Sequence, residues 1–178
     1  FAFGGNALSN LGDAGDSAGT ATTELWFNGG LILGGVLGAG FGLLVVAEGR
    51  HLLERLGAVV FVASMVSMGG VGVFPQDGPY HFQVAVGFYV LFSVAVLIAA
   101  IGQWLGEARR AAVVSVLTGA GNLLTWTIWL QTGGLEQPGL AIPETVGALL
   151  VAGWALVMVG EYVRAEEPSA TDPFEWGH

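Results

Sequence analysis

The sequence predicts an all-α integral membrane protein, folded as an antiparallel bundle of five transmembrane helices. Of its 178 residues, 53% are hydrophobic and only 11% are charged, whereas soluble domains carry about 25% charged residues. Five successive runs contain no charged residue, and each approaches the ~20 residues that a helix needs to cross ~30 Å of hydrocarbon. The runs are apolar on every face, without the alternation of a transmembrane strand.

The expected elements follow in order along a single domain, residues 1–178. Residues 1–24 are rich in Gly, Ser, Thr and Asp and are expected to form a polar loop outside the membrane. Short connections separate the spans and make neighbouring helices antiparallel. The fifth span has the shortest uncharged run, which apolar and aromatic neighbours extend in both directions. The predicted spans are residues 25–47, 56–74, 82–105, 111–132 and 143–162, followed by a tail at 165–178.

The arginines predict the orientation. All five cations are arginine, and they fall in the first loop, in the third loop and just after the last span. Short loops rich in arginine stay in the cytoplasm. We therefore expect a multi-pass protein of the cell membrane, with the start of the chain outside and residues 165–178 in the cytoplasm. A chain that starts outside also leads us to expect a missing N-terminal helix, which would make six.

Charge and cysteine content exclude several classes of function. The net charge of −9 and the absence of lysine argue against a nucleic-acid binder, which needs a basic surface. An acidic chain without lysine is typical of a salt-loving organism. The absence of cysteine excludes disulfides, iron–sulfur clusters and thiol chemistry. We expect no cofactor and no metal site.

The first span carries four glycines spaced four residues apart. Glycine at this spacing forms a groove that lets another helix backbone approach closely. Packing within the chain is the favoured interpretation, and a homo-oligomer or a partner in a membrane complex is the alternative. The glycines are Gly30, Gly34, Gly38 and Gly42.

Polar residues from distant parts of the chain are expected at the outer face, because the topology places them at one depth. Such a group could bind a cation or a polar head group, or supply an acid–base pair. Four of these residues also have a simpler explanation, whereas Asn28 is expected to be buried and bonded to a loop. Ser9 suits a turn, Asp77 and His81 suit a solvated loop, and Glu144 suits the positive end of a helix dipole. The candidate ligand-binding residues are Ser9, Asn28, Asp77, His81 and Glu144, and the catalytic candidates are Asp77, His81 and Ser9.

The rest of the polar residues favour structural roles. Glu48, His51 and Glu54 alternate with Arg50 and Arg55, a pattern that indicates interfacial ion pairs. Asn122 lies deep in the fourth span, where its amide is expected to bond a neighbouring helix. No span carries a charged group at its centre, which argues against an ion-coupled transporter.

Three short segments carry a resemblance to a known family. Residues 6–12 (NALSNLG), 27–32 (FNGGLI) and 74–77 (FPQD), with His81, resemble the family called domain of unknown function 998, from about residue 4 to residue 160. That family comprises small prokaryotic membrane proteins, typically with six predicted helices, and the resemblance implies fold and location but no settled activity. Where the family often has aspartate, this chain has Asn10.

The leading functional hypothesis is a non-catalytic membrane protein whose external polar pocket binds a lipid head group, a small solute or a cation. A second hypothesis is a membrane-embedded lipid hydrolase that uses Asp77 and His81 as acid–base partners. A third is an accessory subunit that packs through the groove from Gly30 to Gly42. The expected partners are membrane lipid and, for the third hypothesis, another copy or a membrane complex.

Overall fold

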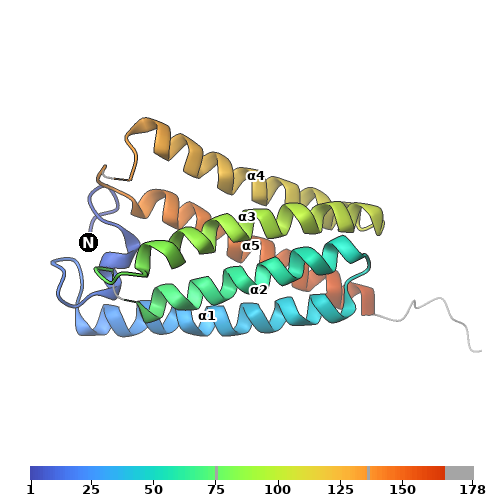
Figure 1. Ribbon diagram of the computed structural model, residues 1–178, viewed down its shortest axis with the longest axis horizontal. Helices are drawn as coiled ribbons and strands as arrows, with labels where there is room; N and C mark the ends of the chain where they lie inside the picture. The colour runs from blue at the N-terminus through green and yellow to red at the C-terminus, as the bar shows by residue number, and fades with distance from the viewer. Residues whose placement is uncertain (75, 136, 167–178) are drawn as a thin grey trace, which may run out of the picture.

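The computed structural model describes residues 1–74, 76–135 and 137–166, without the side chains of residues 165 and 166. The predicted fold class is confirmed, because these residues form five helices long and apolar enough to span a membrane, and no strand. A short 3-10 helix precedes them (Figure 1). The predicted tail after residue 166 lies outside the described residues. The elements are η1 (Leu8–Gly12), α1 (Ala21–Glu48), α2 (Leu52–Val73), α3 (His81–Leu105), α4 (Arg109–Thr132) and α5 (Ala141–Glu166).

Local chemistry accounts for where three of the helices begin. Thr20 caps α1, because its hydroxyl accepts a hydrogen bond from the backbone N–H of Thr23 at 3.1 Å. His51 caps α2 in the same way through Nδ1, which accepts from Leu53 N at 3.1 Å. Pro143 lies in the first turn of α5, where its missing N–H costs no helical hydrogen bond.

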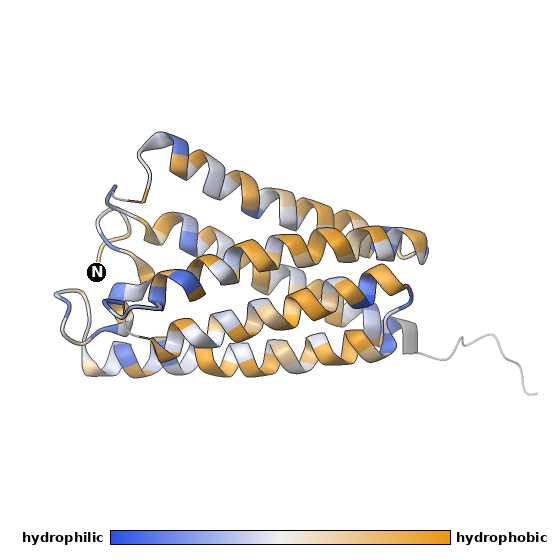
Figure 2. Cartoon of the chain, in the orientation of Figure 1, coloured by the Kyte–Doolittle hydropathy of each residue, from blue (hydrophilic) through white to orange (hydrophobic). Residues whose placement is uncertain are grey.

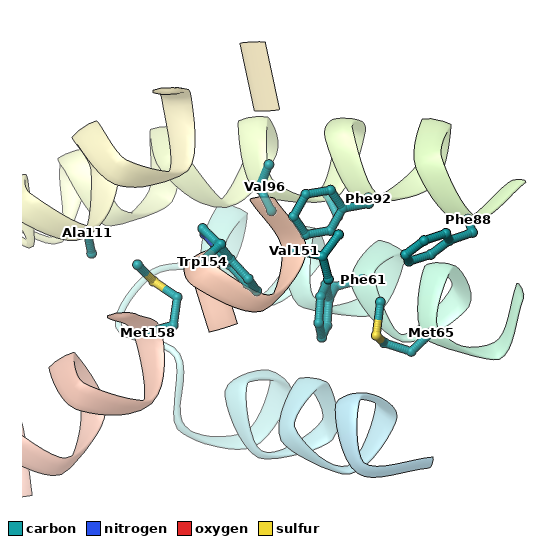
Figure 3. Close-up of a cluster of buried hydrophobic side chains, with 10 residues drawn as sticks. Phe61, Met65, Phe88, Phe92, Val96, Ala111, Val151, Trp154 and Met158 are labelled. Carbon is teal, nitrogen blue, oxygen red and sulfur yellow. The ribbon is translucent and has the colours of Figure 1, made fainter. Parts of the chain in front are cut away.

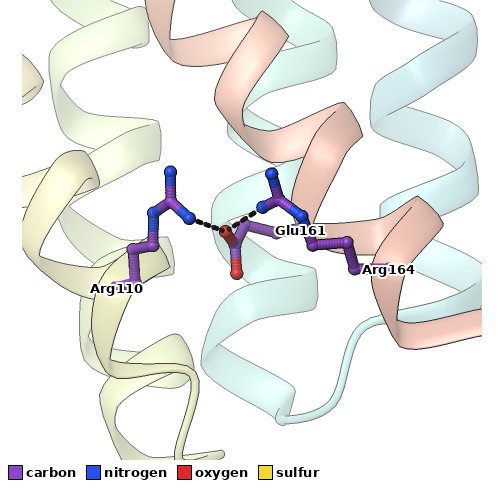
Figure 4. A network of polar contacts seen from close by, with 3 residues as sticks. All are labelled: Arg110, Glu161 and Arg164. Carbon is purple, nitrogen blue, oxygen red and sulfur yellow. Dashed lines mark hydrogen bonds and ion pairs between the residues drawn. The ribbon is translucent and has the colours of Figure 1, made fainter. Parts of the chain in front are cut away.

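The bundle has two chemically different ends. We call the end that holds η1, the start of α1 and the start of α5 the η1 end, and the opposite end the arginine end (Figure 1). All five arginines lie at the arginine end, four of them in or near the connections and Arg164 in the last turn of α5. There Glu161 of α5 pairs with Arg110 of α4 at 3.5 Å and with Arg164 at 3.0 Å (Figure 4). Figure 2 shows that hydrophobic residues dominate the helices between the two ends.

Helices α1 to α4 pack in chain order, and α5 packs on α4 while crossing behind the others (Figure 1). Aromatic contacts join α1 to α5 towards the arginine end, where the ring of Phe41 lies 6.4 Å from Trp154 and 6.2 Å from Tyr162. At the η1 end, η1 packs against both α1 and α5. In the described residues the backbones of these two helices hardly approach each other, which leaves room between them.

The core lies where α2, α3 and α5 meet. Trp154 of α5 packs on Phe61 of α2 and Phe92 of α3, with ring centroids 5.1 and 5.8 Å away (Figure 3). Phe92 is fully buried. The indole N–H of Trp154 donates to the hydroxyl of Ser115 on α4 at 2.8 Å, so a polar contact also fixes α5 against α4.

The surface between the ends is apolar. Leu117, Leu149 and Leu156 are 67%, 67% and 76% exposed. In water, leucine side chains exposed on several helices would form an apolar surface prone to aggregation, whereas in a membrane they contact lipid.

One prediction at the arginine end is wrong. Glu54 was expected to join an interfacial ion pair, but its side chain is fully buried. Its two carboxylate oxygens instead accept hydrogen bonds from Arg50 N at 2.7 Å and from the Tyr162 hydroxyl at 2.9 Å. Among the described residues the ion pairs of this end belong to Glu161. Glu54 therefore links the start of α2 to the end of α5.

Candidate functional site

A cleft of about 660 Å³ lies between α1 and α5, with its floor on α2 and α3 and its top under η1. Most of its wall is aliphatic and aromatic. Ala148 and Ala152 of α5 leave space in the wall, and Gly34 and Gly38 of α1 also line the cleft. The volume falls within the range of ligand pockets, about 300–1,000 Å³.

The cleft is long and opens sideways. On α1 its lining runs from Phe27 to Phe41, which is about 21 Å at 1.5 Å per residue. Leu37, Leu156 and Val159 line it and are also 64%, 76% and 46% exposed. Because these residues lie on the apolar flanks of α1 and α5, the opening faces the hydrocarbon and not the ends of the bundle.

The polar groups of the cleft gather at its η1 end. Its lining there includes Ser9, His81, Tyr89 and Glu144. Glu144 is held in place on both sides: its Oε2 accepts a hydrogen bond from Leu8 N at 2.6 Å, and its backbone carbonyl accepts from the Tyr89 hydroxyl at 3.1 Å. No described residue donates to Oε1 of Glu144. One carboxylate oxygen is therefore available at the head of an apolar cleft.

His81 lines the same region of the cleft. Its Nδ1 lies 3.0 Å from the backbone oxygen of Phe74. A carbonyl oxygen can only accept, so Nδ1 carries the proton and the neutral ring keeps a lone pair on Nε2. Ser9 is 7% exposed. No hydrogen bond joins Ser9 to His81 in the described part of the chain.

Two of the predicted site residues lie apart from the cleft lining. Asp77 is exposed in the connection between α2 and α3, and within the described ranges it makes no hydrogen bond to His81. Asn28 is partly buried, and its Nδ2 donates to the backbone oxygen of Gly12 at 2.9 Å. Asn28 thus fixes the end of η1 to α1.

The glycine stripe of α1 faces α2 over most of its length. A methyl group at Gly34 would contact the end of Met68, one at Gly38 would overlap the Met65 side chain, and one at Gly42 would contact Val62 and Phe61. Gly30 has open space around it. The groove from Gly34 to Gly42 is therefore filled by side chains of α2.

Sequence reasoning missed Tyr89 and the small residues of α5. Tyr89 follows His81 by eight residues, so both lie on one face of α3, and that spacing was a usable signal. Ala148 and Ala152 are four residues apart on α5 and leave a gap in its wall. In the described residues, no group of three His, Cys, Asp or Glu side chains could hold a metal ion.

In a comparison with protein families, residues 4–160 match the model described as "Protein of unknown function (DUF998)". No curated protein matches the chain, and no solved structure matches it.

Proposed function

The chain belongs to the DUF998 family, whose description assigns no activity, and we propose from the geometry of the cleft that this membrane protein binds a lipid. The ligand would be a lipid whose head group carries a hydrogen-bond donor. Its head would lie at the η1 end of the cleft and its chain between α1 and α5. The observation that supports this most is that Glu144 lies at the head of a cleft about 21 Å long and that no described residue donates to its Oε1.

The cleft is amphipathic in the same sense as a lipid. Its polar residues occupy one end, and its remaining length is apolar and open to the side. A small solute or a bare cation would use only the polar end and would leave the apolar length empty. A lipid fills both parts, and it can enter from the bilayer without crossing water.

The head group we favour donates hydrogen bonds. Glu144 and His81 lie at the head of the cleft, and no described residue bonds Oε1 of Glu144 or Nε2 of His81. A carboxylate oxygen accepts, and so does Nε2 of a neutral ring whose Nδ1 carries the proton. An ammonium group has enough N–H donors for both acceptors and a hydroxyl group can donate to one of them, whereas a quaternary ammonium group has no N–H to donate.

We infer that the η1 end faces outwards, because all five arginines lie at the other end and arginine-rich short loops stay in the cytoplasm. The head group would then come from the outer leaflet of the cell membrane. The segment after residue 164 would lie in the cytoplasm.

The other two hypotheses have less support. A hydrolase needs a nucleophile within hydrogen-bond reach of its base, and no bond joins Ser9, His81 and Asp77 in the described residues. An accessory subunit that docks on the glycine groove would have to displace the side chains of Met65 and Met68.

Replacing Glu144 by glutamine is expected to remove the preference for a donor head group. The wild-type protein should bind phosphatidylethanolamine at least about tenfold more tightly than phosphatidylcholine of the same chains, because a hydrogen bond to a charged group contributes about 1.5–3 kcal/mol. In Glu144→Gln the amide oxygen can still accept from Leu8 N, but the group facing the cleft becomes a donor. Native mass spectrometry during a lipid titration measures both affinities.

Glu24→Gln is the matched control for this substitution. Glu24 lies at the same end and accepts a hydrogen bond from Ala14 N at 3.1 Å, but it does not line the cleft. The Glu24→Gln variant should therefore keep the preference for phosphatidylethanolamine over phosphatidylcholine. Equal binding of the two lipids by the wild type, or an equal loss in both variants, would rule out the proposed head-group site.

A further inference from the structure

An apolar groove of about 380 Å³ lies between α3 and α4 at the arginine end, apart from the cleft between α1 and α5. Figure 1 shows α3 and α4 converging towards that end. Two buried alanines, Ala100 of α3 and Ala112 of α4, form the floor of the groove. On α4 its lining runs from residue 112 to residue 117, which is about 8 Å at 1.5 Å per residue. The large residues along its rims are all more than half exposed: Ile101, Trp104, Leu105 and Leu117.

Contacts between α3 and α4 close the groove on the side of the η1 end. A methyl group at Gly119 would be only 2.8 Å from Leu97, so the two helices touch there. One step further, the Asn122 amide donates to the backbone oxygen of Tyr89 at 3.1 Å and to the Ser93 hydroxyl at 2.8 Å, which confirms the predicted bond to a neighbouring helix. The groove is therefore long enough for the first part of an acyl chain and not for a whole one.

Arg109 lies at the other end of the groove, where α4 begins. It precedes Ala112 and Val113 by three and four residues, so it continues the face of α4 that lines the groove. Its guanidinium carbon lies 3.9 Å from the ring centroid of Trp104 on the α3 rim, a cation–π contact that holds the charge beside the groove. Stacking uses the flat face of the guanidinium group, so the N–H groups at its edge stay available to a ligand.

Within the described ranges, the guanidinium group of Arg109 has no carboxylate or carbonyl partner, unlike those of three other arginines. Arg110 and Arg164 both pair with Glu161, and Arg55 donates to a backbone oxygen at 2.8 Å. Arg109 is also exposed. One positive charge with open N–H groups therefore lies at the head of the apolar groove.

We propose that this groove binds an anionic phospholipid, with the phosphate on Arg109 and the upper part of one acyl chain between α3 and α4. The charges are complementary, since a guanidinium group can donate two parallel hydrogen bonds to a phosphate. Trp104 lies between the charge and the apolar groove, at the level where indole rings gather in membranes. With the arginine end in the cytoplasm, the lipid belongs to the inner leaflet. The site differs in leaflet and in charge from the cleft between α1 and α5, and it does not depend on that cleft.

The net charge of the head group decides which phospholipid binds best. Two carboxylates lie near the start of α4 but do not line the groove: Glu161 is paired with two arginines, and Glu107 lines a separate hollow beside Arg50. Phosphatidylcholine also has a phosphate, but its own ammonium group competes with Arg109 for it, whereas phosphatidylglycerol carries no cation. One arginine near an anionic membrane surface contributes about fivefold to binding.

Quenching of Trp104 fluorescence by brominated lipid tests the site directly. The protein is placed in phosphatidylcholine vesicles that contain a small share of phosphatidylglycerol, and a small, equal share of one lipid or the other carries bromine on its acyl chains near the head group. Subtracting the signal of Trp104→Phe, which keeps an aromatic ring beside Arg109, isolates Trp104 among the six tryptophans. We expect brominated phosphatidylglycerol to quench Trp104 about fivefold more than brominated phosphatidylcholine. Equal quenching by the two lipids would overturn the proposal.

Matched variants assign the preference to one arginine. Arg109→Gln removes the charge at the head of the groove and should abolish the preference for phosphatidylglycerol. Arg110→Gln removes the same charge from the next residue, which pairs with Glu161, and it should keep the preference. If both variants lost the preference equally, only the overall charge of the arginine end would attract anionic lipid. A preference that survived in Arg109→Gln would also exclude the site.

Discussion

Replacing Glu54 by alanine should destabilise the protein by about 2–5 kcal/mol, one of the two largest effects that we expect from a single substitution. Glu54 is fully buried, and it accepts hydrogen bonds from Arg50 N and from the Tyr162 hydroxyl. Alanine would leave both donors without their partner, each at about 1–3 kcal/mol. Unfolding by titration with sodium dodecyl sulfate, followed by circular dichroism, measures the loss.

Two further variants test whether the lost stability comes from the hydrogen bonds of Glu54, and not from its charge or from its place at the arginine end. Glu54→Gln keeps one acceptor oxygen and should lose less stability than Glu54→Ala. Glu48→Ala removes an exposed carboxylate at the same end and should change stability by less than about 0.5 kcal/mol. If Glu54→Ala were as stable as Glu48→Ala, the hydrogen bonds of Glu54 would contribute nothing to the fold.

The role of Glu54 illustrates what the sequence could not supply. Its nearest charged residues in the chain suggested an ion pair, because local spacing shows only local partners. The Tyr162 hydroxyl that it accepts from lies 108 residues away. Topology predicts that both residues lie at the arginine end, but it does not predict which side chains meet there.

The fold class was predictable because the thickness of the bilayer and the need for backbone hydrogen bonds allow few structures. An uncharged run of sufficient length must be a helix, since its backbone groups have no other partners in the bilayer. The helix ends were less predictable. Helix α1 begins at Ala21 and ends at Glu48, so it includes Glu24 beyond its uncharged part. Helices continue into the interfacial region, where charge is tolerated.

The depth of the site residues in the membrane was predictable from the sequence, but the direction in which their side chains point was not. The topology placed five polar residues at one end, and three of them, Ser9, His81 and Glu144, line the cleft. Asp77 and Asn28 share that depth but not the cleft lining. Depth follows from the order of spans, whereas direction depends on the rotation of each helix, which nearly uniform hydrophobicity does not encode.

The glycines also show what a sequence pattern predicts and what it does not. The four-residue spacing in α1 identified a face, and that face meets flexible methionine side chains at Gly34 and Gly38. The close approaches to backbone occur at glycines outside the pattern. Gly57 of α2 lies against the backbone of α3, and Gly35 of α1 lies against the backbone of α2. A spacing pattern identifies a surface without large side chains, but it does not show how near the partner helix comes.

Gly57→Ala is accordingly expected to destabilise the bundle by about 3 kcal/mol. A methyl group there would be 2.6 Å from the backbone oxygen of Ala95 and 2.6 Å from the backbone nitrogen of Ala99. Backbone atoms inside a helix cannot move aside as a side chain can, so α2 and α3 would have to separate. Overpacking in a core usually costs about 1–3 kcal/mol, and here the clash is with two backbone atoms at once. The same detergent titration measures the change.

Gly40→Ala provides the control, because it makes the same substitution in a helix of the same bundle where nothing lies within 4 Å of the added methyl group. Alanine favours a helix over glycine by about 1 kcal/mol, so Gly40→Ala should be neutral or slightly stabilising. The same gain in propensity applies at Gly57, and the steric cost must exceed it for the variant to lose stability. Two variants of equal stability would mean that α2 and α3 do not approach as closely as Gly57 requires, and the packing of the core around Phe61 and Phe92 would need revision.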